Sequence, residues 1–258
     1  MSDLAFRPEA IGETLSGMSL LTHLEELRRR ILYSMVGVAA GFFACWYYAE
    51  RIFGLMQQPV VFALQHNGLD TKLVYLNPTE PFNLYLKVGA FAGLFVASPL
   101  VLYQVWMFVA PALYRNERRY MVPFMLATAG LFLAGGYFGY RLVYPAALDF
   151  LIGYGRQFQP MITIGEYTNL FLAIIVGLGL VFELPVLVFF LALMGVVNAG
   201  FMWRNVRYAI LLIFVAAAIL TPTTDIMNMV LFACPMVALY LISIGVAWLV
   251  HPSRRRIS

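Results

Sequence analysis

Long apolar runs separated by short polar and charged segments dominate the pattern along this chain of 258 residues. A helix that crosses about 30 Å of hydrocarbon needs roughly 20 largely apolar residues. Four runs reach this length, and a shorter pair follows them. The pattern therefore predicts six membrane-spanning helices, at about residues 31–48, 82–110, 120–144, 170–194, 208–220 and 227–250. The segment Thr221–Ile226 holds a proline and turn-forming residues, so we interpret the last two spans as a hairpin.

Composition supports a membrane protein, because 62% of the residues are hydrophobic and only 12% are charged. A soluble domain has about 45–50% apolar and about 25% charged residues. We therefore predict an all-α integral membrane protein with a single domain. The first 27 residues contain no apolar run like that of a signal peptide, so we expect no cleaved leader. The loop Ala49–Pro81 is long enough for an ordered cap, with a short amphipathic helix over Leu55–Leu64.

The basic residues predict how the chain is oriented. Most of the 17 lysines and arginines fall in the amino-terminal segment, the loops after the second and fourth spans, and the tail. Loops rich in lysine and arginine stay on the cytoplasmic side. Six is an even number of spans, so the pattern places both termini in the cytoplasm.

Glu183 is a carboxylate inside a predicted span, with no other acidic or basic residue between Glu166 and Arg204. A charge near the bilayer centre costs about 3 kcal/mol on insertion scales, and such residues usually face a protein interior or a water-filled cavity. Pro185, two residues later, is expected to bend the helix beside it. Glu183 is therefore a candidate functional residue.

Two acidic residues lie among arginines on the predicted cytoplasmic face. Thr22 is a plausible N-cap for a helix that carries Glu26 and Arg30 at the i, i+4 spacing, and an ion pair within that helix is a sufficient structural explanation. Glu117 lies beside Arg118 and two further arginines, where it could serve as their counter-ion. If both carboxylates are exposed instead, they suit a cationic peptide, with arginine as the favoured guest because its planar fork matches a carboxylate.

The sequence does not favour a disulfide, a metal site, a protease or a nucleotide-binding protein. Cys45 and Cys234 lie far apart and without metal-ligand spacing, so we predict neither a disulfide nor a metal site. The three histidines lie outside the predicted spans, which argues against an intramembrane serine or metal-dependent protease. No nucleotide-binding Walker motif occurs. We therefore expect no enzyme activity, no cofactor and no nucleic-acid partner.

Four motifs occur in order along the chain: His23–Ile31, Ser98–Arg119, Phe182–Pro185, and Thr221 and Pro222 with Asp225. Together they resemble the TatC family, the receptor subunit of the twin-arginine protein translocase. The resemblance runs from His23 to about Pro235. It implies a concave, glove-like bundle of six helices. The number of six spans is also what the apolar runs predict independently.

The resemblance also implies a function. TatC-like proteins bind the twin-arginine signal peptides of folded precursors at a bacterial inner membrane. They assemble with single-span partners that resemble TatA and TatB and with further copies of themselves. Transport uses the proton-motive force. Glu26 and Glu117 would receive the arginine pair, and Arg28 and Phe108 belong to the same region. Glu183 would contact a partner helix in the bilayer.

The remaining residues implied by the resemblance are structural. Pro59 and Pro99 match prolines that shape the outer cap and the second span. Asp225 matches an acidic residue at the last outer turn, although the interval from Pro222 is one residue longer than in some members. Glu80 matches the entry into the second span.

A transporter of small solutes is the alternative function. An intramembrane carboxylate beside a proline is the feature that a proton-coupled transporter would use, with Glu183 as the relay. The chain shows no repeated halves, which argues against this class. From the residues alone both functions stay open, and the family resemblance favours the receptor.

Overall fold

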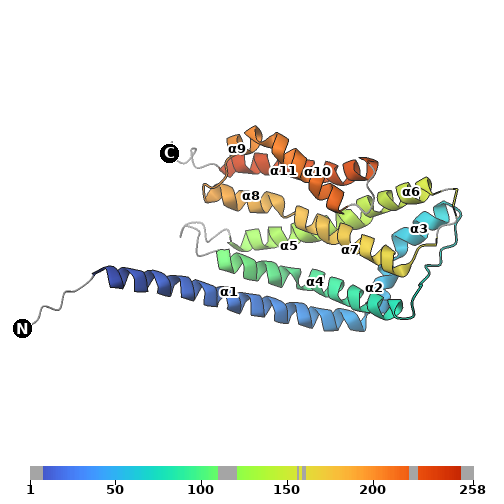
Figure 1. The fold of residues 1–258 in the computed structure, drawn as a ribbon, viewed down its shortest axis with the longest axis horizontal. Helices are drawn as coiled ribbons and strands as arrows, with labels where there is room; N and C mark the ends of the chain where they lie inside the picture. The colour runs from blue at the N-terminus through green and yellow to red at the C-terminus, as the bar shows by residue number, and fades with distance from the viewer. Residues whose placement is uncertain (1–7, 110–120, 156, 159–160, 221–225, 251–258) are drawn as a thin grey trace, which may run out of the picture.

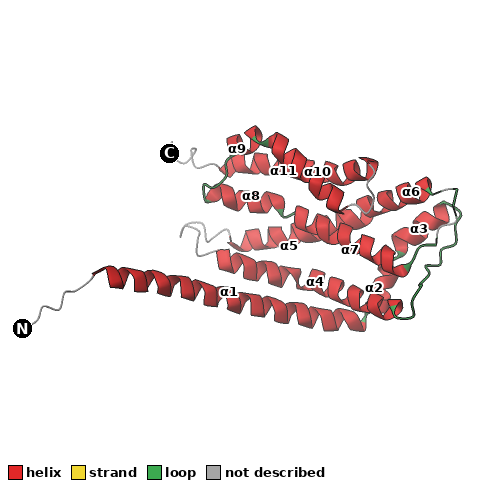
Figure 2. Ribbon diagram, viewed as in Figure 1, coloured by secondary structure: helices red, strands yellow, loops and turns green. Residues whose placement is uncertain are grey.

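A computed structural model describes residues 8–109, 121–155, 157–158, 161–220 and 226–250. The loop that carries Glu117 and the turn that carries Asp225 lie outside these residues. Figure 2 shows that almost all of the described chain is helical. The long helices are α1 (Pro8–Tyr47), α4 (Glu80–Val109), α5 (Met121–Phe138), α7 (Ile164–Val181), α8 (Leu184–Leu193), α10 (Val206–Leu220) and α11 (Ile226–Val250). Shorter elements are α2 (Ala49–Met56), α3 (Gln58–His66), the π-helical turn η3 (Gly139–Val143), α6 (Tyr144–Tyr154) and α9 (Ala199–Arg204).

The described helices make six passages along one bundle, and their arrangement is shown in Figure 1. These passages are α1, α4, α5 continued by α6, α7 continued by α8, α10 and α11. Helix α1 lies at the edge and packs mainly on α4, while α8 packs on α11. The first turns of α1 and the last turn of α11 lie at the same end of the bundle, where α1 projects beyond the other helices. Here we call this the terminal end, and the opposite end the cap end.

Four helical stretches of the described chain are long and apolar enough to cross a membrane: Thr22–Tyr47, Glu80–Phe108, Ile164–Leu193 and Met229–Leu249. The apolar helix Val206–Ile219 is shorter. It corresponds to the first arm of the predicted hairpin, which the sequence already marked as short for a bilayer.

Helix α1 corrects one prediction, because it begins at Pro8 and Thr22 lies inside it. Thr22 is therefore not an N-cap, since a capping residue must have a non-helical backbone. Proline is well suited to the first turn of a helix, where its missing N–H has no partner to lose. The charged residues from Glu25 to Arg30 thus lie on a continuous helix rather than at its start.

The cap helix predicted over Leu55–Leu64 is broken into α2 and α3, which meet at Gln57. Pro59 explains the break, because it has no N–H to donate to the carbonyl of Leu55 four residues earlier. Tyr140 donates its hydroxyl to the Leu55 carbonyl instead, at 2.9 Å, and Tyr167 donates to the carbonyl of Met56. Two tyrosines of the bundle therefore donate to carbonyls at the break, and they fasten the cap to α7 and η3.

Close approach of α1 and α4 depends on glycine. A Cβ at Gly41 would lie 2.7 Å from the carbonyl oxygen of Gly93, and one at Gly93 would lie 2.5 Å from the backbone nitrogen of Phe42. Small residues allow helix backbones to approach closely in membranes, where van der Waals packing replaces the hydrophobic effect as the driving force. This contact holds α1, which otherwise packs on little else, against the bundle.

Candidate functional site

A polar cavity lies between α1 and α4 in the half of the pair nearer the terminal end. It has a volume of about 580 Å³. Its lining combines two acidic residues, two arginines, two tyrosines and two further polar residues: Thr22, Glu25, Glu26, Arg29, Arg30, Tyr33, Tyr103 and Gln104. The α1 residues among them recur every three or four positions, so they form one stripe along the helix.

Arg30 links the two helices at this cavity. Its Nη2 donates to Oε1 of Glu26 at 2.7 Å, and its Nε donates to the same oxygen at 3.2 Å. Its Nη1 donates to Oε1 of Gln104 on α4 at 3.1 Å. The Arg30 side chain is 20% exposed and that of Glu26 is 35% exposed, so the pair is partly shielded from water. The ion pair predicted from the i, i+4 spacing is present.

The second acidic residue, Glu25, is exposed and makes no ion pair with the described part of the chain. Arg29, on the same stripe, donates from Nε to the Tyr33 hydroxyl at 3.2 Å and lies 5.4 Å from the centre of that ring. The cavity therefore contains one carboxylate that is paired and one that is available to a cation.

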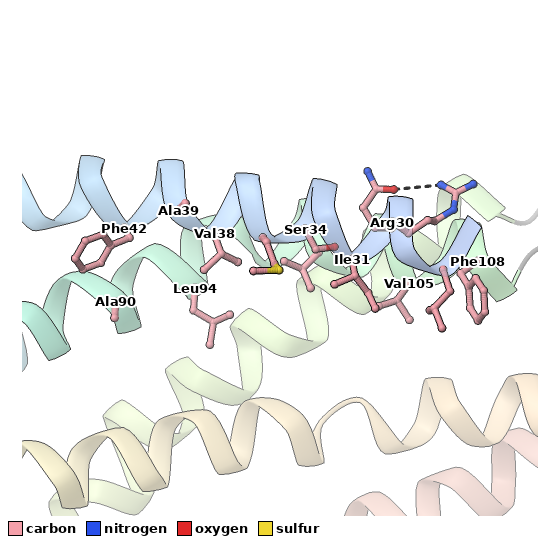
Figure 3. Close-up of a pocket in the computed structure, with 14 residues that line it drawn as sticks. Arg30, Ile31, Ser34, Val38, Ala39, Phe42, Ala90, Leu94, Val105 and Phe108 are labelled. Carbon is pink, nitrogen blue, oxygen red and sulfur yellow. Dashed lines mark hydrogen bonds between the residues drawn. The ribbon is translucent and has the colours of Figure 1, made fainter. Parts of the chain in front are cut away.

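An apolar groove runs along the other side of the α1–α4 contact (Figure 3). It has a volume of about 720 Å³. Side chains from α1 such as Ile31, Val38 and Phe42 line it together with Leu94 and Val105 from α4. Arg30 and Gln104 line both this groove and the polar cavity. They form the boundary between the two.

Phe108 lies at the end of the apolar groove nearest the terminal end, where its ring stacks on His23 with centroids 4.4 Å apart. Arg28 is exposed and lines neither the cavity nor the groove. The structure thus places Glu26 and Phe108 on opposite sides of one helix pair and does not bring Arg28 to either side. The roles of all three in peptide binding stay predictions.

Glu183 lies at a break in the fourth passage, between α7 and α8. The span predicted over 170–194 is therefore two helices. Pro185 lies in the first turn of α8, where it lacks the N–H of a continuous helix. The N–H of Glu183 donates to the Leu180 carbonyl at 3.1 Å, which is the tighter 3₁₀ pattern. The side chain is half-buried, and its Oε1 is buried without a hydrogen-bond partner among the described residues.

The other two structural prolines also lie at helix irregularities. Pro59 lies in the first turn of α3 and is buried. Pro99 lies inside α4, where it cannot donate to the carbonyl of Phe95. The Ser98 hydroxyl donates to that carbonyl at 2.7 Å and satisfies it. Pro99 is therefore accommodated by its neighbour.

Sequence reasoning missed Glu25 and Gln104. Glu25 could have been found, because it lies three and four residues from Thr22 and Arg29 on the stripe that includes Glu26. No sequence signal pointed to Gln104, because its partner Arg30 is 74 positions away in the chain.

These features define a class of protein: an all-α membrane protein with a polar cavity at the terminal end that holds Glu25 and Glu26, which we call the acidic cavity, and with a carboxylate inside one passage that has no partner among the described residues. The family model described as Sec-independent protein translocase protein (TatC) matches residues 22–235. The chain belongs to the TatC family.

Two relatives and two solved structures support this assignment. TatC of Koribacter versatilis is 66% identical over 254 residues, which cover 98% of this chain and 94% of the relative. TatC of Carboxydothermus hydrogenoformans is 37% identical over 236 residues, covering 91% and 95%. A crystal structure of the twin-arginine translocase receptor TatC has a TM-score of 0.78 at 33% identity, covering 87% of this chain and 97% of that chain. A second, in DDM, has a TM-score of 0.79 at 34% identity and covers 87% and 99%.

The predicted fold class, an all-α membrane protein of six helices, is confirmed by these solved relatives and by the helical passages described above. The transporter alternative finds no support, because the relatives are protein translocase components.

Proposed function

We propose that this chain is the receptor of a twin-arginine translocase, which binds the signal peptides of folded precursor proteins and initiates their transport across the membrane. The observation that carries this proposal is the acidic cavity between α1 and α4, in a chain that belongs to the TatC family. No catalytic step is required of the protein in this role.

Guanidinium chemistry explains why arginine suits this cavity. Glu25 and Glu26 lie within one lining, so the cavity presents carboxylates to an incoming cation. An arginine can donate two parallel hydrogen bonds to one carboxylate and stays charged, whereas lysine presents a single, strongly hydrated ammonium. In this proposal Glu26 and Glu117 receive the arginine pair, as the family resemblance implies, Glu25 assists, and Arg28 and Phe108 contact the flanking residues of the peptide.

The proposed setting is a bacterial inner membrane with both termini in the cytoplasm, so that the acidic cavity faces the compartment where precursors fold. Partners would be single-span subunits similar to TatA and TatB, further copies of this chain, and the lipid bilayer. The break at Glu183 supports a contact with one of these membrane helices, because its buried Oε1 accepts no hydrogen bond from the described residues. Asp225 would act at the outer turn, and the proton-motive force would drive transport.

Photo-crosslinking tests the receptor function directly. A photoreactive residue replaces Tyr103, which lines the acidic cavity, in membranes that contain the full chain. Folded precursors are presented with either an arginine pair or a lysine pair in the signal peptide. We expect a crosslink with the arginine pair and its loss with the lysine pair. A photoreactive residue at Gln65, which is exposed on the cap helix α3, provides the control and should give no crosslink.

Equal crosslinking of both precursors at position 103, or of neither, would contradict the assignment of the cavity. The same probe at position 117 extends the test to the loop after α4. A crosslink there that also requires the arginine pair supports a shared site for Glu26 and Glu117.

A further inference from the structure

Arg30 occupies the carboxylate that the proposed function reserves for an incoming arginine. Two of its nitrogens, Nη2 and Nε, donate to Oε1 of Glu26 at 2.7 and 3.2 Å. An arginine of a signal peptide would offer the same fork of donors to the same group. A guanidinium of this chain therefore lies in the proposed binding position.

Arg30 also has a second anchor that does not depend on Glu26. Its Nη1 donates to Oε1 of Gln104 on α4, at 3.1 Å, and Figure 3 draws this hydrogen bond as a dashed line. The nitrogens that contact Glu26 and the one that contacts Gln104 are different, so the first set of bonds can break while the second is kept. Because Arg30 lines the apolar groove as well as the polar cavity, its guanidinium lies at a boundary with space on both sides.

We propose that Arg30 is an intramolecular competitor for Glu26 and sets the affinity threshold of the signal-peptide site. This inference rests on the proposed function, because it takes Glu26 as a carboxylate that binds the peptide. An arriving arginine displaces Nη2 and Nε of Arg30 from Glu26, and Arg30 keeps its bond to Gln104.

Competition of this kind has a definite signature. When only a fraction of the receptor is free to bind, the apparent Kd rises by the inverse of that fraction, whatever the ligand. Arg30 therefore weakens arginine-pair and lysine-pair peptides by the same factor. It leaves their ratio unchanged, and it raises the concentration that any signal peptide must reach. Lysine-pair signal peptides, which bind more weakly, then stay unbound at concentrations at which arginine-pair peptides are bound.

The size of the effect follows from the geometry of the pair. Exposed i, i+4 ion pairs contribute little, and a partly buried, charge-assisted pair contributes more. For a pair with side chains 20% and 35% exposed, we expect a change in Kd of about two- to fivefold.

The test measures binding of fluorescent synthetic signal peptides to the full chain in lipid nanodiscs. One peptide has an arginine pair and the other a lysine pair. We expect Arg30→Gln to bind both peptides about two- to fivefold more tightly than the unaltered chain. The ratio of the two Kd values should not change.

Arg29→Gln is the matched control, because it removes the same charge from the same cavity but from a side chain that donates to Tyr33. We expect a smaller gain than with Arg30→Gln. Gln104→Leu removes the bond between α1 and α4 and keeps the Arg30–Glu26 pair, so it should not reproduce the gain.

Several results would overturn the inference. Weaker binding by Arg30→Gln would mean that Arg30 supports the peptide or the helix contact. An equal gain in Arg29→Gln would assign the effect to local charge, and an equal gain in Gln104→Leu would assign it to a looser helix pair. If the unaltered chain prefers the arginine pair and Arg30→Gln brings no gain, this inference fails and the proposed function stands. If the unaltered chain does not distinguish the two peptides, both fail.

Discussion

At the scale of single residues, Glu26 and Glu183 are carboxylates in opposite situations. Oε1 of Glu26 accepts two hydrogen bonds from Arg30, whereas Oε1 of Glu183 is buried with no partner in the described chain. A paired carboxylate adds little to the free energy of the folded state, and it can exchange one guanidinium partner for another. A buried polar atom without a partner costs about 1–3 kcal/mol. The first arrangement suits reversible peptide binding, and the second suits a group whose partner arrives from outside the chain.

Glu26→Ala is expected to weaken an arginine-pair signal peptide by about ten- to hundredfold, because it removes a charge-assisted hydrogen-bond acceptor. Titration of a fluorescent peptide against the full chain in nanodiscs measures this change. Glu50→Ala is the control, since Glu50 is exposed at the first turn of α2, near the cap end. An unchanged Kd in Glu26→Ala, or an equal loss in Glu50→Ala, would remove Glu26 from the site.

Replacement of Glu183 should separate stability from transport. In the isolated chain Glu183→Leu removes a buried polar atom that has no partner among the described residues, so the thermal unfolding temperature in detergent should stay the same or rise. Export of a twin-arginine precursor in cells should fall strongly. Glu183→Gln keeps a hydrogen-bonding group of the same shape and should retain more export.

Two outcomes would contradict this role of Glu183. A clear fall in the unfolding temperature of Glu183→Leu would show that the carboxylate stabilises its own chain. Equal and complete loss of export in the Gln and Leu variants would favour a charged or protonatable group over a hydrogen-bonding one.

At the scale of helices, α1 is attached mainly through its long contact with α4. The glycines at this contact bring the two backbones together, and at the other end of the same contact Arg30 joins Gln104. The position of the acidic cavity therefore depends on packing far along the helix, since the cavity is lined by both helices.

Gly93→Ala is expected to destabilise the protein by about 1–3 kcal/mol, because its Cβ would meet the backbone of α1 at 2.5 Å and backbone cannot rotate away. Gly130→Ala on α5 is the matched control. A Cβ there meets nothing within 4 Å, so the same substitution should be neutral or slightly stabilising. Thermal unfolding of both variants in detergent, followed by circular dichroism, measures the difference. Equal unfolding temperatures would show that α1 and α4 can separate without cost.

At the scale of the whole molecule, the sequence predicted the six passages because apolar length alone determines which segments can span a bilayer. It did not predict how far α1 extends ahead of its apolar run, or the break in the cap helix. In the described chain α1 extends from Pro8 through Thr22, and at the break at Gln57 tyrosines from η3 and α7, distant in sequence, donate to the carbonyls of Leu55 and Met56.

The sequence predicted the contacts of the site that lie within one helix, but not those between helices. The Glu26–Arg30 pair is local to one helix and follows from spacing, whereas the bond from Arg30 to Gln104 exists only because α1 and α4 pack together. The separation of Glu26 from Phe108 likewise depends on which stripe of a helix each faces, and family resemblance carries no such information. Glu117 and Asp225 lie outside the described residues, so their roles stay predictions.

The orientation of the molecule is the last prediction. Helix α9, which ends at Arg204, lies toward the terminal end of the bundle, while α2, which carries Arg51, lies toward the cap end (Figure 1). Because clustered arginines stay on the cytoplasmic side, the terminal end should face the cytoplasm. In a variant without Cys45 and Cys234, a cysteine at exposed Gln65 should react with a membrane-impermeant thiol reagent added outside the inner membrane. A cysteine at exposed Arg28 should react only after the membrane is opened. The reverse labelling pattern would show the opposite topology, with the acidic cavity outside the cytoplasm, where it could not bind cytoplasmic precursors.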